Sequence, residues 1–214
     1  MEYNEKMLEA KRKLLERFRH QGPSAPAPTR DRLPPGQHLT KGFPILDLGV
    51  HPQFHPKHWR FQVEGEVENS IDVNWEGFVQ LLPKKDQVAD FHCVTTWSKF
   101  DVQWGGLNFL DLAALVRPTG AARFLIAHSA DGYTTNMPLA DCMDEDVILA
   151  YELFGQPLPL EHGGPLRLVV PKLYAWKSAK FLRKLVFAPQ DQPGFWEVRG
   201  YHNHGDPWTE ERHG

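Results

Sequence analysis

Short apolar stretches alternate with turn residues along most of the chain. Residues 60–67, RFQVEGEV, place apolar and polar side chains on alternate positions, which predicts a half-exposed strand that ends at a turn. Residues 87–95 predict a second strand whose C-terminal end carries Cys93. Similar runs predict further strands at residues 123–127, 132–137, 147–153, 166–170 and 181–187.

Two segments between these strands predict short helices. Asn74 is a typical helix N-cap, and the segment after it extends to Leu82, where Pro83 would end a helix. Residues 107–116, LNFLDLAALV, carry apolar side chains at helical spacing and are followed by an Arg-Pro stop. Because these strands and helices follow one another in no regular order, the pattern predicts a mixed, β-rich α+β fold rather than repeated βαβ units.

The N-terminal part of the chain has a different pattern. Residues 4–20 combine apolar side chains near helical spacing with lysine and arginine, which predicts an amphipathic helix that packs on the body or meets a membrane or partner. Residues 22–36 contain five prolines, which predict a stiff and extended connector. We therefore expect residues 1–38 to form an N-terminal helix and connector, and residues 39–214 to form one folded domain.

Composition excludes several classes of function. A net charge of -3 lacks the basic excess of a nucleic-acid-binding protein, and every apolar run is far shorter than the roughly 20 residues of a membrane span. The charged N-terminus has no apolar signal-peptide core, so we expect a cytoplasmic protein. Two cysteines are too few for a disulfide framework, a four-cysteine iron–sulfur cluster or a cysteine-rich zinc finger.

The two cysteines occur in different surroundings. Cys93 lies in the segment FHCVTTWS at the end of a predicted strand, where it is either a small buried apolar residue or a reactive thiol. Cys142 lies in LADCMDEDV, which matches no catalytic motif, and we interpret it as structural.

A second group of candidate residues lies in HGGPLRLVVPKLYAWKSAK, residues 162–180. Basic side chains close to a serine and to glycine-rich turns are suited to bind an anion, because phosphate oxygens accept charge-assisted hydrogen bonds. The candidates are Arg167, Lys172, Lys177, Ser178 and Lys180. The alternative is that Lys177 and Lys180 lie on a solvated face. Neither a GxxxxGK[ST] loop nor a GxGxxG motif is present, so an ordinary nucleotide site has no support.

Histidines form two further clusters. His51, His55 and His58 resemble a metal triad, but the intervening prolines exclude a regular helix that would align them. The tail GYHNHGDPWTEER contains His202 and His204, and it either covers the body or contributes to a site. A zinc hydrolase that uses the tail histidines, Cys93 or the His51 cluster is therefore an alternative function.

The order of four segments resembles the sulfite-oxidase-like, molybdopterin-dependent oxidoreductases, in particular their short bacterial single-domain members, which are related to the catalytic subunit of the periplasmic methionine-sulfoxide reductase. The segments are FHCVTTWS, AHSADGYTTNMPL, HGGPLRLVVPKLYAWKSAKFL and GFWEVRGYHNHGDPW, and the resemblance spans residues 39–208. It implies the sulfite-oxidase-type fold and a molybdenum-molybdopterin cofactor. In that family the cysteine of the first segment ligates molybdenum, which corresponds to Cys93 here.

The resemblance also implies a set of cofactor contacts. Arg167, Ser178 and Lys180 would bind the pterin phosphate together with the backbone of Ala179, and Lys177, His162, His128 and Ser129 are further candidates. Trp97, Tyr174 and the tail histidines are expected to line the substrate funnel, where Arg60, Lys99 or Lys172 would serve an anionic substrate.

The implied reaction is a two-electron oxygen-atom transfer on a small oxo-substrate, either a sulfite-type oxidation or a sulfoxide-type reduction. A separate electron-transfer partner is expected. The alternative within the same resemblance is a non-catalytic protein that carries molybdopterin.

Overall fold

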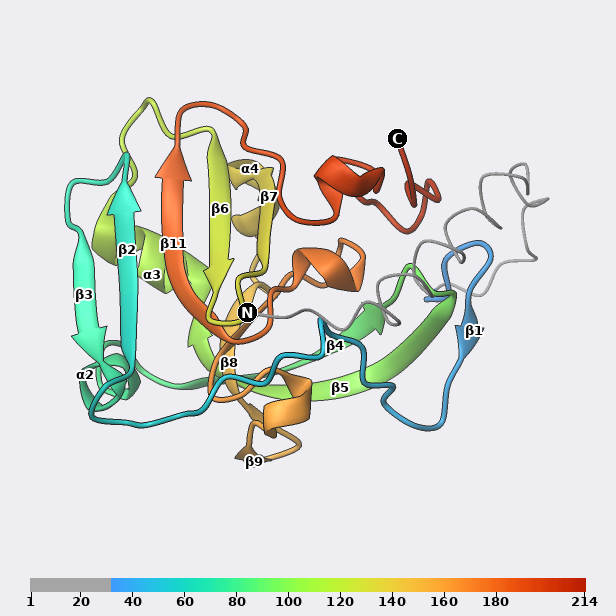
Figure 1. Ribbon diagram of the computed structural model, residues 1–214, viewed down its shortest axis with the longest axis horizontal. Coiled ribbons are helices and arrows are strands. Elements are labelled where there is room, and N and C mark those ends of the chain that lie inside the picture. Colours follow the sequence, from blue (N-terminus) through green and yellow to red (C-terminus); the bar gives the residue numbers. More distant parts are fainter. Residues whose placement is uncertain (1–31) are drawn as a thin grey trace.

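Two β-sheets organise the computed structural model, which describes residues 32–214 (Figure 1). The helix predicted at residues 4–20 and the first part of the predicted connector lie outside this range, so the domain division stays a prediction. The mixed α+β fold is confirmed, because both sheets combine with short helices only.

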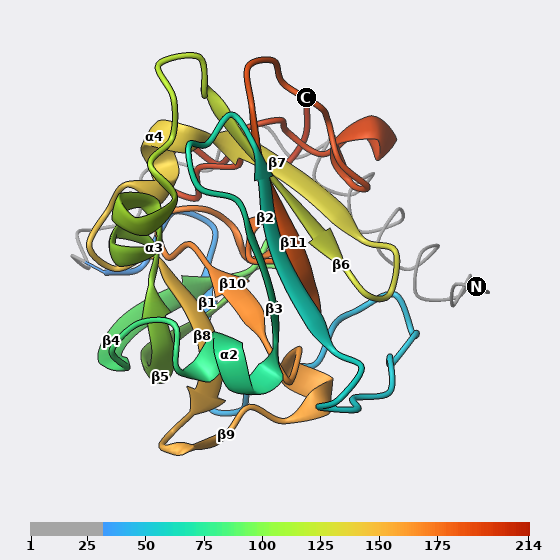
Figure 2. The same ribbon diagram turned by 90° about the vertical axis from the view of Figure 1, so that its left-hand side faces the viewer.

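The first sheet has five strands in the order β3-β2-β11-β6-β7. These are β3 (Ile71–Asn74), β2 (Arg60–Gly65), β11 (Leu182–Ala188), β6 (Phe124–Ser129) and β7 (Thr134–Pro138). The predicted alternation is confirmed in β2, where Phe61 and Val63 are fully buried and their neighbours are not. Strands β2 and β11 are parallel although they are far apart in sequence, and Figure 2 shows them side by side.

The second sheet has six strands: β1 (His38–Leu39), β4 (Lys85–His92), β5 (Trp97–Asn108), β8 (Ile148–Leu153), β9 (Gln156–Pro157) and β10 (Arg167–Val169). The long strand β5 was not predicted, and its last two residues were assigned to a helix. Gly106 of this strand has no room for a side chain, because a Cβ atom there would be 2.1 Å from the carbonyl oxygen of Leu149 on β8. The glycine therefore permits close pairing of the two strands.

The helices are short, as predicted. In α2 (Trp75–Val79), the side chain of Asn74 accepts a hydrogen bond from the amide of Gly77, which confirms the predicted cap. Helix α3 (Phe109–Val116) is capped in the same way by Asn108 and ends at Arg117 in the left-handed region. The remaining helices are α4 (Leu139–Cys142) and the 3-10 helices η1 (Leu160–His162), η2 (Ala175–Lys177) and η3 (Glu197–Arg199).

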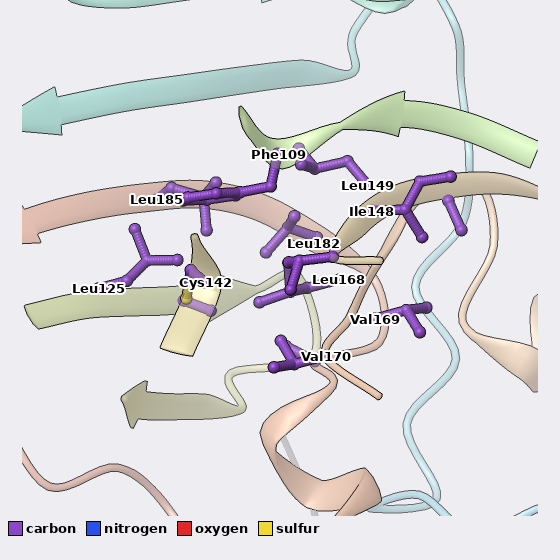
Figure 3. Packing of buried hydrophobic residues seen from close by; sticks show 14 of the residues in the cluster. Phe109, Leu125, Cys142, Ile148, Leu149, Leu168, Val169, Val170, Leu182 and Leu185 are labelled. Carbon is purple, nitrogen blue, oxygen red and sulfur yellow. The ribbon is translucent and has the colours of Figure 1, made fainter. Parts of the chain in front are cut away.

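The hydrophobic core contains side chains from both sheets and from the helices (Figure 3). Leu182 and Leu185 come from β11, Leu149 comes from β8, and Phe109 of α3 stacks on Phe187 with ring centroids 6.1 Å apart. Cys142 is fully buried in this core, where burial strongly raises the pKa of its thiol. Its position agrees with a structural role.

Candidate active site

A cleft lies where the β4–β5 hairpin meets the loops around β10 and η2. It contains about 760 Å³ of space outside protein atoms, part of which is open to solvent. Five of the predicted site residues line it: Cys93, His162, Arg167, Ser178 and Lys180. The tertiary structure thus brings the β4–β5 hairpin next to the segment of residues 162–180, which is distant in sequence.

Cys93 occupies the tip of the β4–β5 hairpin, directly after β4 ends at His92. The amide of Cys93 donates to the carbonyl of Trp97 at 2.9 Å, and the amide of Thr96 donates to the carbonyl of Cys93 at 3.0 Å. Thr96 has a φ of 72°, which allows the turn to close within a few residues. The cysteine is 7% exposed and still lines the cleft, so its sulfur can reach a bound group without facing bulk water.

Arg167, the first residue of β10, is a buried cation. Its guanidinium donates to the carbonyl oxygens of His162 at 2.9 Å and of Ser178 at 3.0 Å, and it lies 5.1 Å from the ring centroid of Phe91. In the described part of the chain, no carboxylate forms an ion pair with it. Burial therefore lowers the pKa of Arg167 to about 9, and the positive charge is available to an anionic ligand in the cleft.

The segment Ser178, Ala179 and Lys180 is attached to β10 by backbone contacts. The amide of Val170 donates to the hydroxyl of Ser178 at 2.9 Å, and the amide of Leu168 donates to the carbonyl of Ala179 at 2.9 Å. Ala179 does not line the cleft, whereas the residues on either side of it do. Ser178 and Lys180 thus line the cleft from one short, well-anchored segment, and the ammonium of Lys180 donates to the carbonyl of Glu161 at 2.6 Å.

Two carboxylates accompany this segment, and sequence reasoning did not identify either of them. Asp47 accepts from the ring of His51 at 3.0 Å and lies 3.5 Å from the ammonium of Lys180. Burial raises the pKa of Asp47, but the amide of Gly49, the ring of His51 and the charge of Lys180 lower it more, so the net shift is downward. Asp131 also lines the cleft, and there burial raises the pKa of the carboxyl group. A polar run at a turn was the only local signal for these residues.

Other predicted cofactor contacts lie in different places. His162 lines the cleft and stacks on Phe43 with ring centroids 4.6 Å apart. Burial lowers the pKa of His162, and the positive charges of Lys180 and Arg167 lower it further to a smaller extent. His128 and Ser129, at the end of β6, do not line the cleft.

Lys177 does not line the cleft, and its side chain is fully buried. Its ammonium lies 2.6 Å from Glu197 and donates to the carbonyl oxygens of Asn136 at 2.7 Å and of Asn203 at 2.6 Å. The interpretation of Lys177 as part of a solvated face is therefore wrong, because a buried carboxylate on η3 takes up its charge. Lys180 is 16% exposed at its side chain, so it does not lie on a solvated face either.

Aromatic side chains cover the cleft on the side of the C-terminal tail. Tyr201, Trp196 and Trp176 line it, and the ring centroids of Trp196 and Tyr201 are 4.8 Å apart. Trp97 lines it as predicted, but Tyr174 and the tail histidines do not. The density of aromatic residues in the tail sequence was the signal for this wall, although it did not identify which rings face the cleft.

The histidine clusters are used in other contacts. His204 bridges Glu211 at 2.8 Å and Asp141 at 3.0 Å, which attaches the tail to α4. His51 pairs with Asp47. Within residues 32–214, no three histidine, cysteine or acidic side chains are grouped so that they could hold a metal ion, so the residues of the zinc alternative are not brought together.

The same range has no helix of the length and apolar character needed to cross a membrane.

The donor set fits a molybdopterin cofactor. A buried cysteine and a buried arginine line one cleft together with a serine and a lysine, and among the described residues the arginine has no carboxylate partner. A thiolate is a soft ligand for a transition metal, and the cationic and hydroxyl groups match a phosphate.

Comparisons with known proteins agree with this fit. Residues 48–196 match the family model of the oxidoreductase molybdopterin-binding domain. The chain is 43% identical over 182 residues to the uncharacterised oxidoreductase YuiH of Bacillus subtilis, a match that covers 85% of this chain and 91% of YuiH. It is 29% identical to the protein-methionine-sulfoxide reductase catalytic subunit MsrP of Burkholderia mallei, a match that covers 70% of this chain and 50% of MsrP.

A solved structure shows the same fold. The sulfane dehydrogenase SoxCD from Paracoccus pantotrophus matches with a TM-score of 0.58 and 22% identity, over 65% of this chain and 40% of that chain. The chain therefore spans half or less of the length of MsrP and SoxCD. The family model and the identity to YuiH establish that this chain is an oxidoreductase and belongs to the family of oxidoreductases with a molybdopterin-binding domain.

Proposed function

We propose that this oxidoreductase holds molybdenum on molybdopterin, with Cys93 as its protein ligand, and that it carries out a two-electron oxygen-atom transfer on a small oxo-substrate. The observation that supports this most directly is the buried sulfur of Cys93 on the same cleft as Arg167, a buried cation that has no carboxylate partner within residues 32–214. When bound, the cofactor supplies a two-electron redox centre that can exchange an oxygen atom.

The residues of the chain would bind and orient the cofactor. Arg167, Ser178 and Lys180 would hold its phosphate, since these residues line the cleft and Arg167 has no carboxylate partner in the described residues. The hairpin would hold the Cys93 sulfur, and the aromatic wall of Trp196 and Tyr201 would limit the access of water.

We further propose that the substrate is a neutral, dipolar oxo-compound such as a sulfoxide rather than an anion such as sulfite. The three cations predicted to serve an anionic substrate are engaged elsewhere. Arg60 pairs with Asp72, Lys172 pairs with Asp141, and Lys99 donates to the carbonyl of Lys41. None of the three lines the cleft. The sequence identity to MsrP, a methionine-sulfoxide reductase subunit, also supports a sulfoxide as the substrate.

Because a substrate of this kind exchanges two electrons, the proposal includes a separate electron-transfer partner. The alternative, a protein that carries molybdopterin without turnover, predicts a bound cofactor that no oxo-substrate or thioether oxidises or reduces. A spectroscopic measurement of the metal therefore distinguishes these two functions, and this measurement does not require the physiological partner.

The first experiment is metal and pterin analysis of protein produced in cells that synthesise the cofactor, for the wild type, Cys93→Ser and the matched control Cys142→Ser. We expect near-stoichiometric molybdenum and pterin in the wild type and in the folded control. We expect pterin and molybdenum in Cys93→Ser as well, but a changed electron paramagnetic resonance signal of the metal, because its sulfur ligand from the protein is lost. A wild type without molybdenum, or the same metal signal in all three proteins, would contradict the proposed ligand.

The second experiment adds dimethyl sulfoxide or sulfite to the loaded protein and follows the metal by absorption and electron paramagnetic resonance. The proposal predicts that the dithionite-reduced protein is reoxidised by the sulfoxide, and that sulfite reduces the oxidised protein much more slowly. If neither compound changes the oxidation state, the carrier function is supported instead.

A further inference from the structure

A side-chain hydroxyl is in contact with the sulfur of the proposed metal ligand. The hydroxyl of Thr95 donates a hydrogen bond to the Sγ atom of Cys93 over 3.2 Å. Thr95 is half-buried and lines the same cleft as Cys93. No motif or family resemblance identified this residue, because it is one of two adjacent threonines in the hairpin turn.

The turn holds this hydroxyl in place through contacts on both sides. Two donors reach the carbonyl of Cys93, the amide of Thr96 at 3.0 Å and the side chain of Gln37 at 3.1 Å. The carbonyl of Val94 accepts from the buried guanidinium of Arg212 at 2.8 Å. Segments from both ends of the described chain thus fix the backbone around Thr95, so its hydroxyl needs no rearrangement to meet the sulfur.

The neighbouring threonine provides a comparison within the same turn. The hydroxyl of Thr96 donates to the backbone carbonyl of Thr95 at 2.7 Å, and Thr96 does not line the cleft. The two side chains have the same chemistry and are adjacent in sequence, but the contact of Thr95 is with the sulfur and that of Thr96 is with the backbone. A general effect of the turn would involve both residues, whereas an effect on the sulfur would involve Thr95.

We propose that Thr95 is a positioning and tuning residue that raises the reduction potential of the metal centre through its hydrogen bond to Cys93. This inference rests on the proposed function, in which Cys93 ligates molybdenum. A hydrogen bond stabilises negative charge on a thiolate, which weakens electron donation to the metal and favours the reduced state. A higher potential favours acceptance of electrons from a donor before an oxo-substrate is reduced.

The test uses the loaded protein in four forms: wild type, Thr95→Val, Thr95→Ser and the matched control Thr96→Val. Valine keeps the branched shape and removes the hydroxyl, whereas serine keeps the hydroxyl. Molybdenum and pterin content are measured first. The reduction potential is then measured by titration with dithionite and ferricyanide, followed by electron paramagnetic resonance.

We expect equal molybdenum content in all four proteins and a lower potential in Thr95→Val alone. Loss of one such hydrogen bond is expected to change the ratio of reduced to oxidised metal about tenfold, which is ~59 mV for a one-electron step. Thr95→Ser and Thr96→Val should both have the potential of the wild type.

Three results would overturn the inference. The first is a Thr95→Val protein with full molybdenum content and the wild-type potential, which would leave the proposed function intact. The second is loss of molybdenum in Thr95→Val, since the hydroxyl would then act in metal retention rather than in tuning. The third is a wild type that binds no molybdenum, which would overturn the proposed function and this inference together.

Discussion

Replacement of Arg167 by methionine should separate cofactor binding from folding stability. Arg167 is 3% exposed, and in the described residues its guanidinium contacts carbonyl oxygens and aromatic rings but no carboxylate. Methionine has a similar length and is apolar, so Arg167→Met removes the charge without a large cavity. We expect little change in the stability of the cofactor-free protein and a large loss of cofactor.

The magnitude follows from two opposing contributions. Burial lowers the pKa of Arg167 from 12.5 to about 9. This shift means that burial destabilises the charged form, relative to the neutral form, by about 5 kcal/mol. Two hydrogen bonds from a charged donor, at about 1.5 to 3 kcal/mol each, and the cation–π contacts with Phe91 and Trp104, at about 0.5 kcal/mol each, together return roughly 4 to 7 kcal/mol. The net effect on the free energy of unfolding should therefore be within about 2 kcal/mol of zero.

Cofactor binding should respond more strongly than stability. A charge-assisted hydrogen bond to a phosphate contributes about 1.5 to 3 kcal/mol, which corresponds to roughly a 10- to 100-fold loss of affinity. The assays are urea unfolding of protein from cells without cofactor synthesis, and pterin fluorescence per mole of protein from cells that make the cofactor. Arg123→Met is the matched control, because Arg123 is exposed and donates to the carbonyl of Gly120.

A specific result would refute this reasoning. If Arg167→Met lost about 3 to 5 kcal/mol of stability, as expected for a broken buried charge network, and still retained wild-type amounts of pterin, Arg167 would be a structural residue. The cleft would then lack its main anion-binding group, and the assignment of the phosphate site would be withdrawn.

Three further predictions concern the stability of the fold. Lys177→Met should lose about 3 to 5 kcal/mol in urea unfolding because it leaves the buried charge of Glu197 without its cation; the double variant with Glu197→Gln should recover part of this, and no recovery would contradict the pairing. Gly106→Ala should destabilise strongly, because its Cβ would be 2.1 Å from a backbone oxygen, whereas Gly120→Ala, with no atom within 4 Å, should have little effect. Glu211→Gln should lose about 1 kcal/mol at pH 7. Burial raises the pKa of Glu211, but amide and imidazole hydrogen bonds hold it below 4.5, so this difference should disappear as the pH falls through the lowered pKa.

Local sequence patterns were sufficient for most of the strands and for the two helices predicted within residues 32–214. In β2 and in helix α2, the pattern of burial and the capping residue depend on residues close in sequence, so they can be read from the chain alone. Strand β5 could not be predicted in this way. Its Gly-Gly pair resembles a turn signal, and only the pairing with β4 on one side and β8 on the other explains its length.

The candidate site divides in a similar way. Cys93, Arg167, Ser178 and Lys180 were identified from short motifs, since a thiol and basic groups near glycine-rich turns already indicate their chemistry, and the structure places all four on one cleft. The two carboxylates and the aromatic wall were not identified, because nothing in the local sequence shows which polar or aromatic side chains of a loop face inward.

The sequence by itself determined which residue types were available for chemistry, the mixed α+β class and the family. Tertiary structure decided the direction of each side chain. Lys177 and Ser178 are adjacent, but the ammonium of Lys177 turns to a buried carboxylate from η3, whereas Ser178 faces the cleft. Thr95 and Thr96 differ in the same way at the sulfur of Cys93. The physical reason is that a buried polar group must find a partner, and which partner lies within reach depends on segments distant in sequence.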